Sequence, residues 1–377
     1  MTTPERLIEI LANKKTLPAS WRQAVATVDR GLFVPGTIEV DDRTIHRSDG
    51  SDEWARAVYG DLSLITQIND GRPTGEDAYR LPTSSSSMPT VMLEMLDALD
   101  VRPGHRVLEI GTGTGYNAAL LCRRLGDESV TSIEVDPDVA ATARRNLEAA
   151  GSSPRLVVGD GLAGHAQGGP YDRIIATCTV RDIPFAWIEQ LAPEGRLITL
   201  WGSSYFAYSY ASLTATRRGE ATGRLWGRPA FMWLRGHRSG AGLLRECLHH
   251  RDQATVRRTR LSPYDVEDLD PRFAVSLSVR DAWPLLCTAE DGSDEATLWV
   301  ISDDHASWAA VEYVPGQTDF GVRQYGPRSV WNEVERAFAS WEGAENPGRE
   351  RFGLTVDTNG QHLWLDSPDR PWNPPSD

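Results

Sequence analysis

RVLEIGTGTGYNAALL, residues 106–121, is the stretch of sequence that decides the fold. It begins with an apolar run that is typical of a buried strand, and this run ends at a glycine. The residues that follow, 117–126, favour a helix that stops at Gly126. A glycine-rich turn between a strand and a helix is the setting in which α/β proteins hold nucleotide-like ligands.

The same alternation continues along the chain. Further strands are predicted at 129–135, 155–159, 172–177 and 196–202, with helices at 137–151 and 183–191 between them. Strands that alternate with helices imply βαβ units and a parallel sheet. We therefore expect an α/β fold, a doubly wound Rossmann-like sheet. Two later segments, 205–219 and 223–236, predict an antiparallel hairpin at its C-terminal end.

The chain has 377 residues, more than one domain of about 100–200 residues needs, so it is divided into three parts. Residues 1–80 hold two short helices and then a segment rich in Asp, Gly and Thr, which we interpret as a loop-rich lid without a core. Residues 81–240 form the α/β domain. Residues 241–377 mix a predicted helix, 329–343, with short strands and are expected to be an α+β extension and a possible peptide-binding domain.

Tryptophan is concentrated in the C-terminal part, where ten of the thirteen lie beyond residue 200. Large aromatic side chains dominate burial, so most of them are expected in the core. The alternative is a peptide-binding groove, because Trp, Tyr and Arg are favoured at interfaces. The segment FMWLRGHR, with Arg235 and Arg238, is the candidate edge of such a groove.

Composition excludes several classes of protein. A net charge of −14 argues against nucleic-acid binding, which needs a basic surplus. No apolar run reaches the roughly 18 residues of a transmembrane helix, and the charged N-terminus does not look like a signal peptide. The four cysteines form no CxxC pair, so we expect neither a metal site nor a disulfide framework. These features favour a cytoplasmic protein, and they leave its oligomeric state open.

The glycine spacing separates two kinds of cofactor. A dinucleotide fingerprint, GxGxxG, would place its third glycine where this chain has Tyr116, which disfavours an NAD-dependent dehydrogenase. Glu109, two residues before the first glycine, suits a cationic ligand such as the α-ammonium of S-adenosylmethionine better than a pyrophosphate. Glu134 ends the second strand and can accept hydrogen bonds from ribose hydroxyls. Asp160 and Gly161 end the third strand, where the adenine edge is expected.

All these positions lie at the carboxyl ends of strands, where open α/β sheets bind ligands. The alternative, a glycine turn used only for strand–helix packing, does not explain the acidic residues in register with it. The predicted cofactor site is Glu109, Gly111, Thr112, Gly113, Gly115, Tyr116, Asn117, Glu134, Val135, Asp160, Gly161 and Leu162.

From about residue 20 to residue 235 the chain resembles the protein-L-isoaspartate (D-aspartate) O-methyltransferase family. The matching segments keep the order and spacing of the family: RGLFVP, AVYGD (57–61), SMPTVMLEML (87–96), VLEIGTGTGYNAALL (107–121), VVGDGLAG (157–164), PYDRIIAT (170–177) and IPFAWIEQLAPEGRLI (183–198). The resemblance implies a class I methyltransferase fold for residues 81–240, S-adenosyl-L-methionine as cofactor and a carboxylate of a peptide or protein as acceptor.

The resemblance also implies an active-site hydroxyl in a Ser-x-Pro element, for which Ser87-Met88-Pro89 is the best match. A helix N-cap is the alternative role of Ser87. The alignment stays open by a few positions because a serine run precedes it. The candidate substrate residues are Ser84, Ser85, Ser86, Met88, Thr177 and Arg235.

Two features depart from the repair enzymes of this family: the long continuation of the chain and the segment TSSSSMP (83–89). Both resemble a longer bacterial branch found beside lanthipeptide and graspetide biosynthesis. That resemblance implies methylation of a normal aspartate in a macrocyclised precursor peptide, after which the ester closes to a succinimide (aspartimide) or opens to isoaspartate. The alternatives are general isoaspartyl repair and a peptide-binding module that has lost catalysis.

Overall fold

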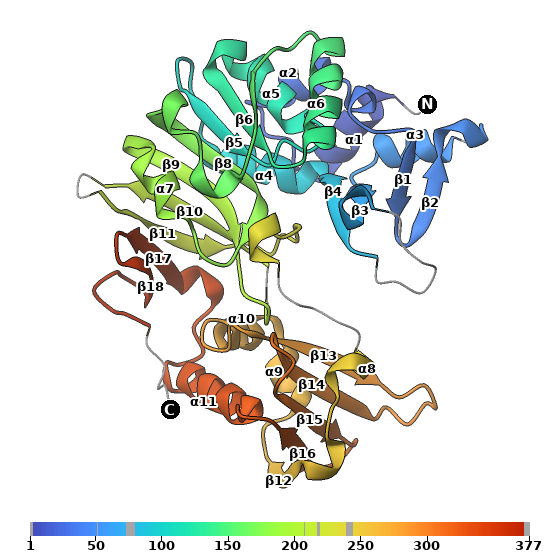
Figure 1. Ribbon diagram of the computed structural model, residues 1–377, viewed down its shortest axis with the longest axis vertical. Coiled ribbons are helices and arrows are strands. Elements are labelled where there is room, and N and C mark those ends of the chain that lie inside the picture. The colour runs from blue at the N-terminus through green and yellow to red at the C-terminus, as the bar shows by residue number, and fades with distance from the viewer. Residues whose placement is uncertain are drawn as a thin grey trace.

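The computed structural model describes residues 3–50, 52–72, 80–206, 208–216, 219–238 and 244–372. Figure 1 shows an upper lobe built on a large sheet, a small sheet at its side and a separate lower lobe. No helix among the described residues is long and apolar enough to cross a membrane.

The upper lobe contains a nine-stranded sheet of order β18-β17-β11-β10-β9-β8-β5-β6-β7. Its parallel part confirms the predicted doubly wound α/β fold. The parallel strands are β5 (Val107–Ile110), β6 (Val130–Glu134), β7 (Arg155–Val158), β8 (Tyr171–Val180) and β9 (Leu191–Trp201). The antiparallel strands β10 (Ser209–Ala215) and β11 (Ala221–Trp226) follow as the predicted hairpin.

Helices cover both faces of this sheet. They are α4 (Pro89–Leu99), α5 (Tyr116–Leu125), α6 (Pro137–Ala149) and α7 (Phe185–Glu189). Alternate residues of β8 point to opposite faces, so Ile174 packs in one core with Trp187 while Ile175 packs in the other with Leu93. Burial on both faces explains why these strands read as continuous apolar runs.

The N-terminal region corrects one prediction. Helices α1 (Pro4–Asn13) and α2 (Arg22–Thr27) agree with the sequence, but the described residues between 36 and 80 are not a coreless lid. They hold β1 (Thr37–Val40), β2 (Arg43–His46), α3 (Glu53–Val58) and β3 (Leu64–Ile68), which join β4 (Pro82–Ser86) in a sheet of order β2-β1-β3-β4. Ile38, Trp54 and Leu64 belong to a core of its own. β2 (RTIH) and β4 (PTSSS) are mostly polar, so no apolar run like that of β5 marks them as strands.

The lower lobe is a five-stranded antiparallel sheet of order β12-β16-β15-β14-β13. Its strands are β12 (Thr255–Thr259), β13 (Ala282–Thr288), β14 (Ala296–Ser302), β15 (Trp308–Tyr313) and β16 (Phe320–Tyr325). Its helices are α8 (Leu244–Cys247), α9 (Pro263–Glu267), α10 (Leu269–Ser276) and α11 (Val330–Gly343). Trp331 of α11 is fully buried in its core, and Trp308 is buried on the other face of the sheet, as expected of most tryptophans.

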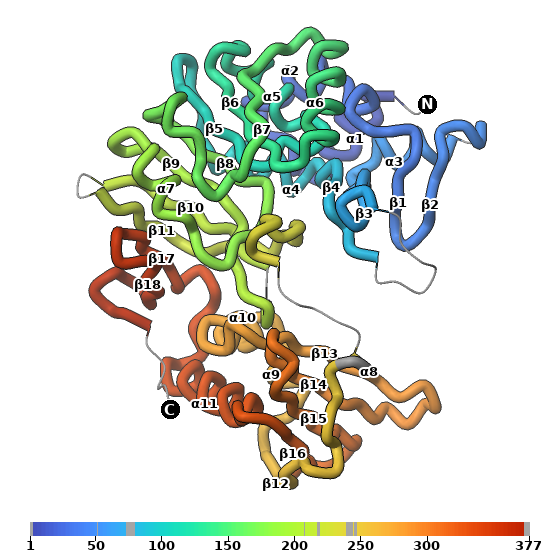
Figure 2. Tube along the Cα trace, in the orientation of Figure 1, coloured from blue at the N-terminus to red at the C-terminus, as the bar shows by residue number. Residues whose placement is uncertain are grey.

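The chain then returns to the upper lobe, which the predicted boundary at residue 240 does not describe. Figure 2 follows it from α11 back up to β17. Strands β17 (Phe352–Asp357) and β18 (Gly360–Leu365) extend the nine-stranded sheet, and β17 pairs with β11 through Ala221↔Val356 and its neighbours. The predicted α+β extension is therefore not a separate C-terminal domain. Its elements from α8 to α11 lie in the chain between β11 and β17, which are neighbouring strands of the nine-stranded sheet.

Candidate active site

A cavity of about 890 Å³, including its open mouth, lies at the carboxyl ends of β5, β6 and β8. This is the edge at which open α/β sheets bind ligands. Its walls come from the glycine loop, the end of β6, the end of β8, the serine strand β4 and a segment after β11. The predicted residues that line it are Ser84, Ser85, Ser86, Ser87, Gly111, Thr112, Gly113, Tyr116, Asn117, Glu134, Val135, Thr177 and Arg235.

The glycine loop turns sharply because Gly111 and Gly113 have φ angles of 91° and 55°, a region that side chains disfavour. A Cβ on Gly111 would lie 3.0 Å from Oγ1 of Thr177. That hydroxyl donates a hydrogen bond to the carbonyl of Gly111 at 2.7 Å. Thr177 therefore anchors the loop to β8, and Gly115 opens α5 as its N-cap residue.

Glu134 lines the cavity at the end of β6. Its Oε2 accepts a hydrogen bond from the amide of Gly113 at 2.9 Å, and its Oε1 accepts one from the amide of Asp136 at 3.0 Å. Burial raises the pKa of Glu134, and these two amides and Arg235 act against the increase. Each carboxylate oxygen keeps a further lone pair. Glu134 can therefore accept hydrogen bonds from ribose hydroxyls, as predicted.

Glu109 lies behind the cavity wall and does not line it. It is fully buried, its Oε1 accepts from Nδ2 of Asn117 at 2.7 Å, and its Oε2 accepts from Oγ of Ser132 at 2.5 Å. Burial raises its pKa to about 7, against the lowering effect of both hydrogen bonds. The structure thus gives Glu109 a role through Asn117, whereas the sequence predicted direct contact with a cationic ligand.

Asn117 supplies a test of whether S-adenosylmethionine fits. Its Oδ1 is buried, and no described residue donates a hydrogen bond to it. Because Asn117 lines the cavity, an α-ammonium group bound there could satisfy this acceptor. The residues that would hold the cofactor are therefore Asn117 and the glycine loop at the amino-acid end and Glu134 at the ribose.

The predicted adenine-binding residues lie beside the cavity and do not line it. Asp160 is exposed, and its Oδ1 caps the turn Gly161–Ala163 by accepting from the amide of Leu162 at 3.0 Å. A Cβ on Gly161 would lie 2.5 Å from Ile110. These positions fix the strand end, and adenine contact by Asp160, Gly161 and Leu162 stays a prediction.

The four serines of the run, residues 84–87, differ in the hydrogen bonds of their hydroxyl groups. The hydroxyl of Ser84 accepts from Thr66 at 3.1 Å, and that of Ser86 accepts from Nε of Arg30 at 3.3 Å. For the hydroxyls of Ser85 and Ser87, which also line the cavity, the described residues include no hydrogen-bond partner. Ser85 and Ser87 are thus the two serines of the run whose hydroxyls make no hydrogen bond to a described residue, and Ser87 keeps the Ser-x-Pro spacing. Met88 is the N-cap residue of α4, without a side-chain cap.

The segment after β11 closes one side of the cavity, and the sequence predicted it as strand. We call residues 227–238 the strap. The strand ends at Trp226, Gly227 has a φ of 63°, and the strap then runs along the end of β8. There the amide of Thr179 donates to the carbonyl of Met232 at 2.8 Å, and the amide of Leu234 donates to Thr179 at 2.9 Å. The lining residues that sequence reasoning missed include Met92 and Cys178, whereas Phe231, Met232, Trp233 and Leu234 belong to FMWLRGHR, the segment predicted as the edge of a groove.

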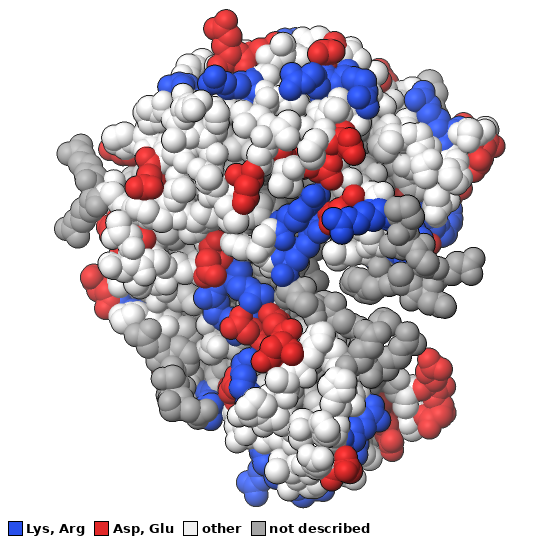
Figure 3. All heavy atoms as spheres, in the orientation of Figure 1, with Lys and Arg blue, Asp and Glu red and all other residues white. Residues whose placement is uncertain are grey.

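Ion pairs tie the strap to two other parts of the cavity mouth. Nη2 of Arg235 lies 3.2 Å from Asp136, the N-cap of α6, and 3.1 Å from Asp70, which follows β3. Nη1 of Arg238 lies 3.1 Å from both carboxylate oxygens of Asp70. We call Asp70, Asp136, Arg235 and Arg238 the latch. In the view of Figure 3, basic and acidic side chains lie next to one another around the centre of the molecule.

Known proteins match the chain over the part that carries this cavity. A family model described as protein-L-isoaspartate(D-aspartate) O-methyltransferase (PCMT) matches residues 43–208. The protein-L-isoaspartate O-methyltransferase 2 of Archaeoglobus fulgidus is 33% identical over 234 residues, which are 62% of this chain and 92% of that protein. This chain belongs to the protein-L-isoaspartate O-methyltransferase family. The family member of Hyperthermus butylicus is 33% identical over 230 residues, 58% of this chain and 83% of that one.

A solved structure titled protein-L-isoaspartate O-methyltransferase is similar to this chain, with a TM-score of 0.53 and 23% identity. The match covers 97% of this chain and 100% of the other chain. It supports the fold. As a member of the family, the protein is an S-adenosylmethionine-dependent O-methyltransferase of aspartyl or isoaspartyl carboxylates in polypeptides. Among the described residues, no group of His, Cys, Asp and Glu could hold a metal ion.

Proposed function

We propose that the enzyme esterifies the side-chain carboxylate of a normal aspartate in a ribosomally made, macrocyclised precursor peptide. The observation that carries this proposal is the attachment of the lower lobe to the strap through Arg181. Its guanidinium pairs with Asp281 at 2.5 Å and with Asp303 at 3.0 Å, both in the lower lobe.

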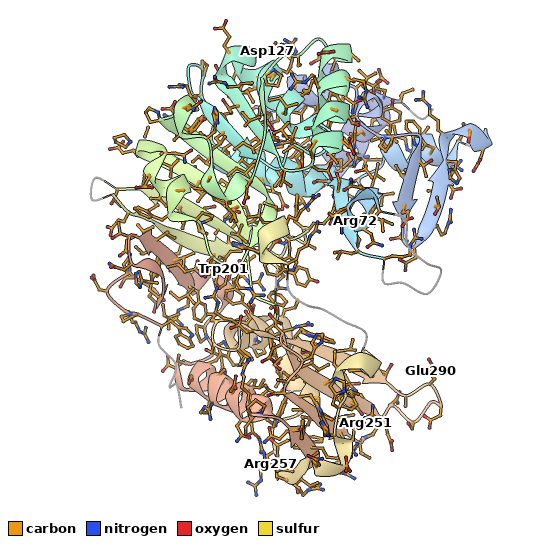
Figure 4. All side chains as sticks on the ribbon, viewed as in Figure 1. Arg72, Asp127, Trp201, Arg251, Arg257 and Glu290 are labelled. Atoms are coloured by element: carbon orange, nitrogen blue, oxygen red, sulfur yellow. The ribbon has the colours of Figure 1, made fainter. Side chains whose placement is uncertain are left out.

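Arg181 also contacts the strap directly. Its amide donates to Nδ1 of His237 at 3.2 Å, and its guanidinium lies 6.0 Å from the ring centre of Trp233. Trp233 lines the cavity, so one arginine connects the lower lobe to the wall formed by the strap and the serine strand β4, which we call the acceptor side of the site. Figure 4 labels Trp201 at the same junction, where its Nε1 donates to Gln361 at 3.3 Å. A large, constrained substrate would meet both lobes here, whereas a short flexible peptide needs only the cavity.

The residues present suit a carboxylate acceptor. An aspartate has an ordinary pKa of about 4, so it is ionised at neutral pH and needs no general base. Catalysis then consists of placing the acceptor oxygen in line with the methyl group, and the hydroxyl of Ser87 can orient the carboxylate by donating a hydrogen bond. S-adenosylmethionine supplies an electrophilic methyl group when bound.

The methyl ester makes a further reaction possible within the peptide. The backbone nitrogen of the next residue attacks the ester carbonyl, a C–N bond forms, the C–O bond breaks and methoxide leaves with the nitrogen's proton as methanol. The product is a five-membered succinimide. This step needs no group of the enzyme, so the identity of the acceptor decides the outcome: modification of a normal aspartate or repair of an isoaspartate.

Mass spectrometry of a macrocyclised precursor, incubated with enzyme and S-adenosylmethionine, tests the proposal. We expect a transient gain of one methylene, followed by a product one water lighter than the starting peptide. The control is the same precursor with its aspartate replaced by asparagine, which should not change mass. Efficient methylation of isoaspartyl peptides, with no reaction of any aspartyl precursor, would contradict the proposal.

General isoaspartyl repair is the second candidate, and it is favoured by the name of the relatives, protein-L-isoaspartate O-methyltransferases. The solved structure with the isoaspartate title spans nearly all of this chain, lower lobe included, so the extension is compatible with either acceptor. The ratio of kcat/KM on matched aspartyl and isoaspartyl peptides separates the two functions. A module without catalysis would bind peptide but transfer no methyl group to either kind.

A further inference from the structure

Arg30 is a buried arginine outside the cavity lining, only 1% exposed, in the turn Arg30–Leu32. Its Nη1 donates to the carbonyls of Val58 and Gly60, both at 3.0 Å. Its Nη2 donates to the carbonyl of Leu62 at 2.9 Å. The carbonyl of Val58 ends α3, and those of Gly60 and Leu62 belong to the connection between α3 and β3.

The same guanidinium holds the end of the serine strand. Nη2 donates to the carbonyls of Ser86 at 3.2 Å and Ser87 at 2.9 Å, and Nε donates to the hydroxyl of Ser86 at 3.3 Å. A guanidinium is planar and its N–H groups have a fixed geometry. One rigid group therefore sets the position of Ser86 and Ser87 relative to the 58–62 connection.

Asp61 fixes the other side of the Ser-x-Pro element. Its Oδ1 accepts from the amide of Thr90 at 2.9 Å, and its Oδ2 accepts from the hydroxyl of Thr90 at 2.7 Å and from Lys14 at 2.7 Å. Asp61 lies between the two residues, Gly60 and Leu62, whose carbonyls Arg30 binds. The backbone of Ser87 is thus held from Arg30 before it and from Asp61 after it.

The hydrogen bonds of Arg30 are directed at the acceptor side of the cavity, while its charge also acts on Tyr116, a lining residue at the start of α5. Among the described residues it donates no hydrogen bond to the glycine loop or to Glu134, the cofactor side. Burial lowers its pKa to about 10, so the guanidinium stays charged at neutral pH. Burying a charge among carbonyls is costly and is retained only where the geometry is closely satisfied.

We propose that Arg30 is a positioning residue for methyl transfer, which acts through the backbone of Ser86 and Ser87 to fix the hydroxyl of Ser87 at the acceptor. The inference rests on the proposed role of Ser87. A displacement of about 1 Å at a reacting centre can lower a rate by about a hundredfold.

The test compares Arg30→Met and Arg30→Lys with Arg349→Met. Arg349 is the matched control because it is also 1% exposed, donates to the carbonyls of Tyr208 and Gly227, and has a pKa lowered to about 10 by burial. All assays are run well below the measured unfolding temperature, on whichever aspartyl or isoaspartyl peptide the unmodified enzyme methylates.

For Arg30→Met we expect kcat to fall by roughly tenfold to a hundredfold, with the Kd for S-adenosylmethionine unchanged within about twofold. Arg30→Lys, which keeps the charge and some of the donors, should recover part of the rate. Arg349→Met should lower the unfolding temperature but reduce kcat much less than Arg30→Met does, because Gly227, which Arg349 binds, begins the strap and does not line the cavity. If Arg30→Met or, where that variant does not fold, Arg30→Lys keeps the full kcat, the proposal is wrong.

A double-mutant cycle with Ser87→Ala distinguishes this failure from failure of the proposed site. If Arg30 acts through Ser87, adding Arg30→Lys to Ser87→Ala should lower kcat by less than it does in the unmodified enzyme. Additive losses in kcat would overturn the proposal for Arg30. Full activity of Ser87→Ala itself would instead overturn the role of Ser87 and, with it, this inference. Because the acceptor peptide is chosen by activity, the choice between aspartate and isoaspartate does not affect the cycle.

Discussion

The carboxyl group of Glu109 is buried, and its ionisation makes the stability of the folded protein depend on pH. Its pKa is about 7 in the folded protein against an ordinary value of 4.5, chiefly because of burial. Between these two values the folded state holds a proton that the unfolded state has released. The free energy of unfolding therefore falls as pH rises through this window. Above it, Glu109 contributes no further change.

We predict that Glu109→Gln removes this part of the pH dependence. A glutamine cannot ionise, and its Oε1 can still accept from Asn117, which donates to Oε1 of Glu109 at 2.7 Å. The free energy of unfolding in urea, measured at about pH 5 and about pH 8, should fall less between the two in the variant than in the unmodified protein. Glu128→Gln, at an exposed position in the turn Asp127–Ser129 before β6, should keep the unmodified slope. Equal slopes for Glu109→Gln and the unmodified protein would disprove the prediction.

The strap is a segment whose structure the sequence pattern did not predict correctly. Residues 223–236 contain alternating apolar residues and were expected to be one strand, but the strand ends at Trp226. Gly227 and Pro229 mark that end, because both residues interrupt strands. What the local pattern does not contain is the place where the strap docks. That place depends on Thr179 and Asp70, which are far from the strap in sequence.

We predict that Asp70→Asn loosens the strap at little cost in global stability. Asp70 has a φ of 55°, which asparagine also tolerates, so the change removes charge and keeps the backbone. Its contacts with Arg235 and Arg238 are partly exposed, so the loss in unfolding free energy should be about 1 kcal/mol or less. Hydrogen exchange at the amides of Leu234 and His237 should become faster.

The control for this prediction is an ion pair of the same kind in the lower lobe. Arg258 lies 2.5 Å from Asp319, and both side chains are about half exposed. Asp319→Asn should change exchange locally and leave the strap unaffected. Unaltered exchange at Leu234 in Asp70→Asn would show that the latch does not hold the strap.

At the scale of the molecule, the sequence predicted the features that depend on neighbouring residues and missed the contacts between residues that are far apart in the chain. The strands from Val107 to Trp201 and the site residues Gly113 and Glu134 were predictable, because each follows from a strand, a turn and a helix adjacent in the chain. Arg30 was not, because its partner Ser86 lies 56 residues away. The return of β17 to β11 was missed for the same reason: no pattern within a strand names its partner.

Because β17 returns to the upper sheet, we expect the two lobes to stabilise each other. A substitution at Gly353 tests this expectation. A Cβ on Gly353 would lie 2.1 Å from the ring of Trp364 in the paired strand β18. That ring cannot easily move, because Arg224 lies 4.5 Å from its centre and its Nε1 donates to Thr355 at 3.1 Å. We predict that Gly353→Ala destabilises the protein by about 1–3 kcal/mol, the usual cost of overpacking.

The matched change is Gly343→Ala in α11, where a Cβ would meet nothing within 4 Å. It should be neutral or stabilising, since alanine favours a helix more than glycine does. Calorimetry should show one unfolding transition for the unmodified protein and for Gly343→Ala. In Gly353→Ala the edge strands should separate from β11, so the two lobes should unfold in separate transitions. A single, unshifted transition in Gly353→Ala would mean that β17 and β18 do not couple the lower lobe to the sheet that carries the active site.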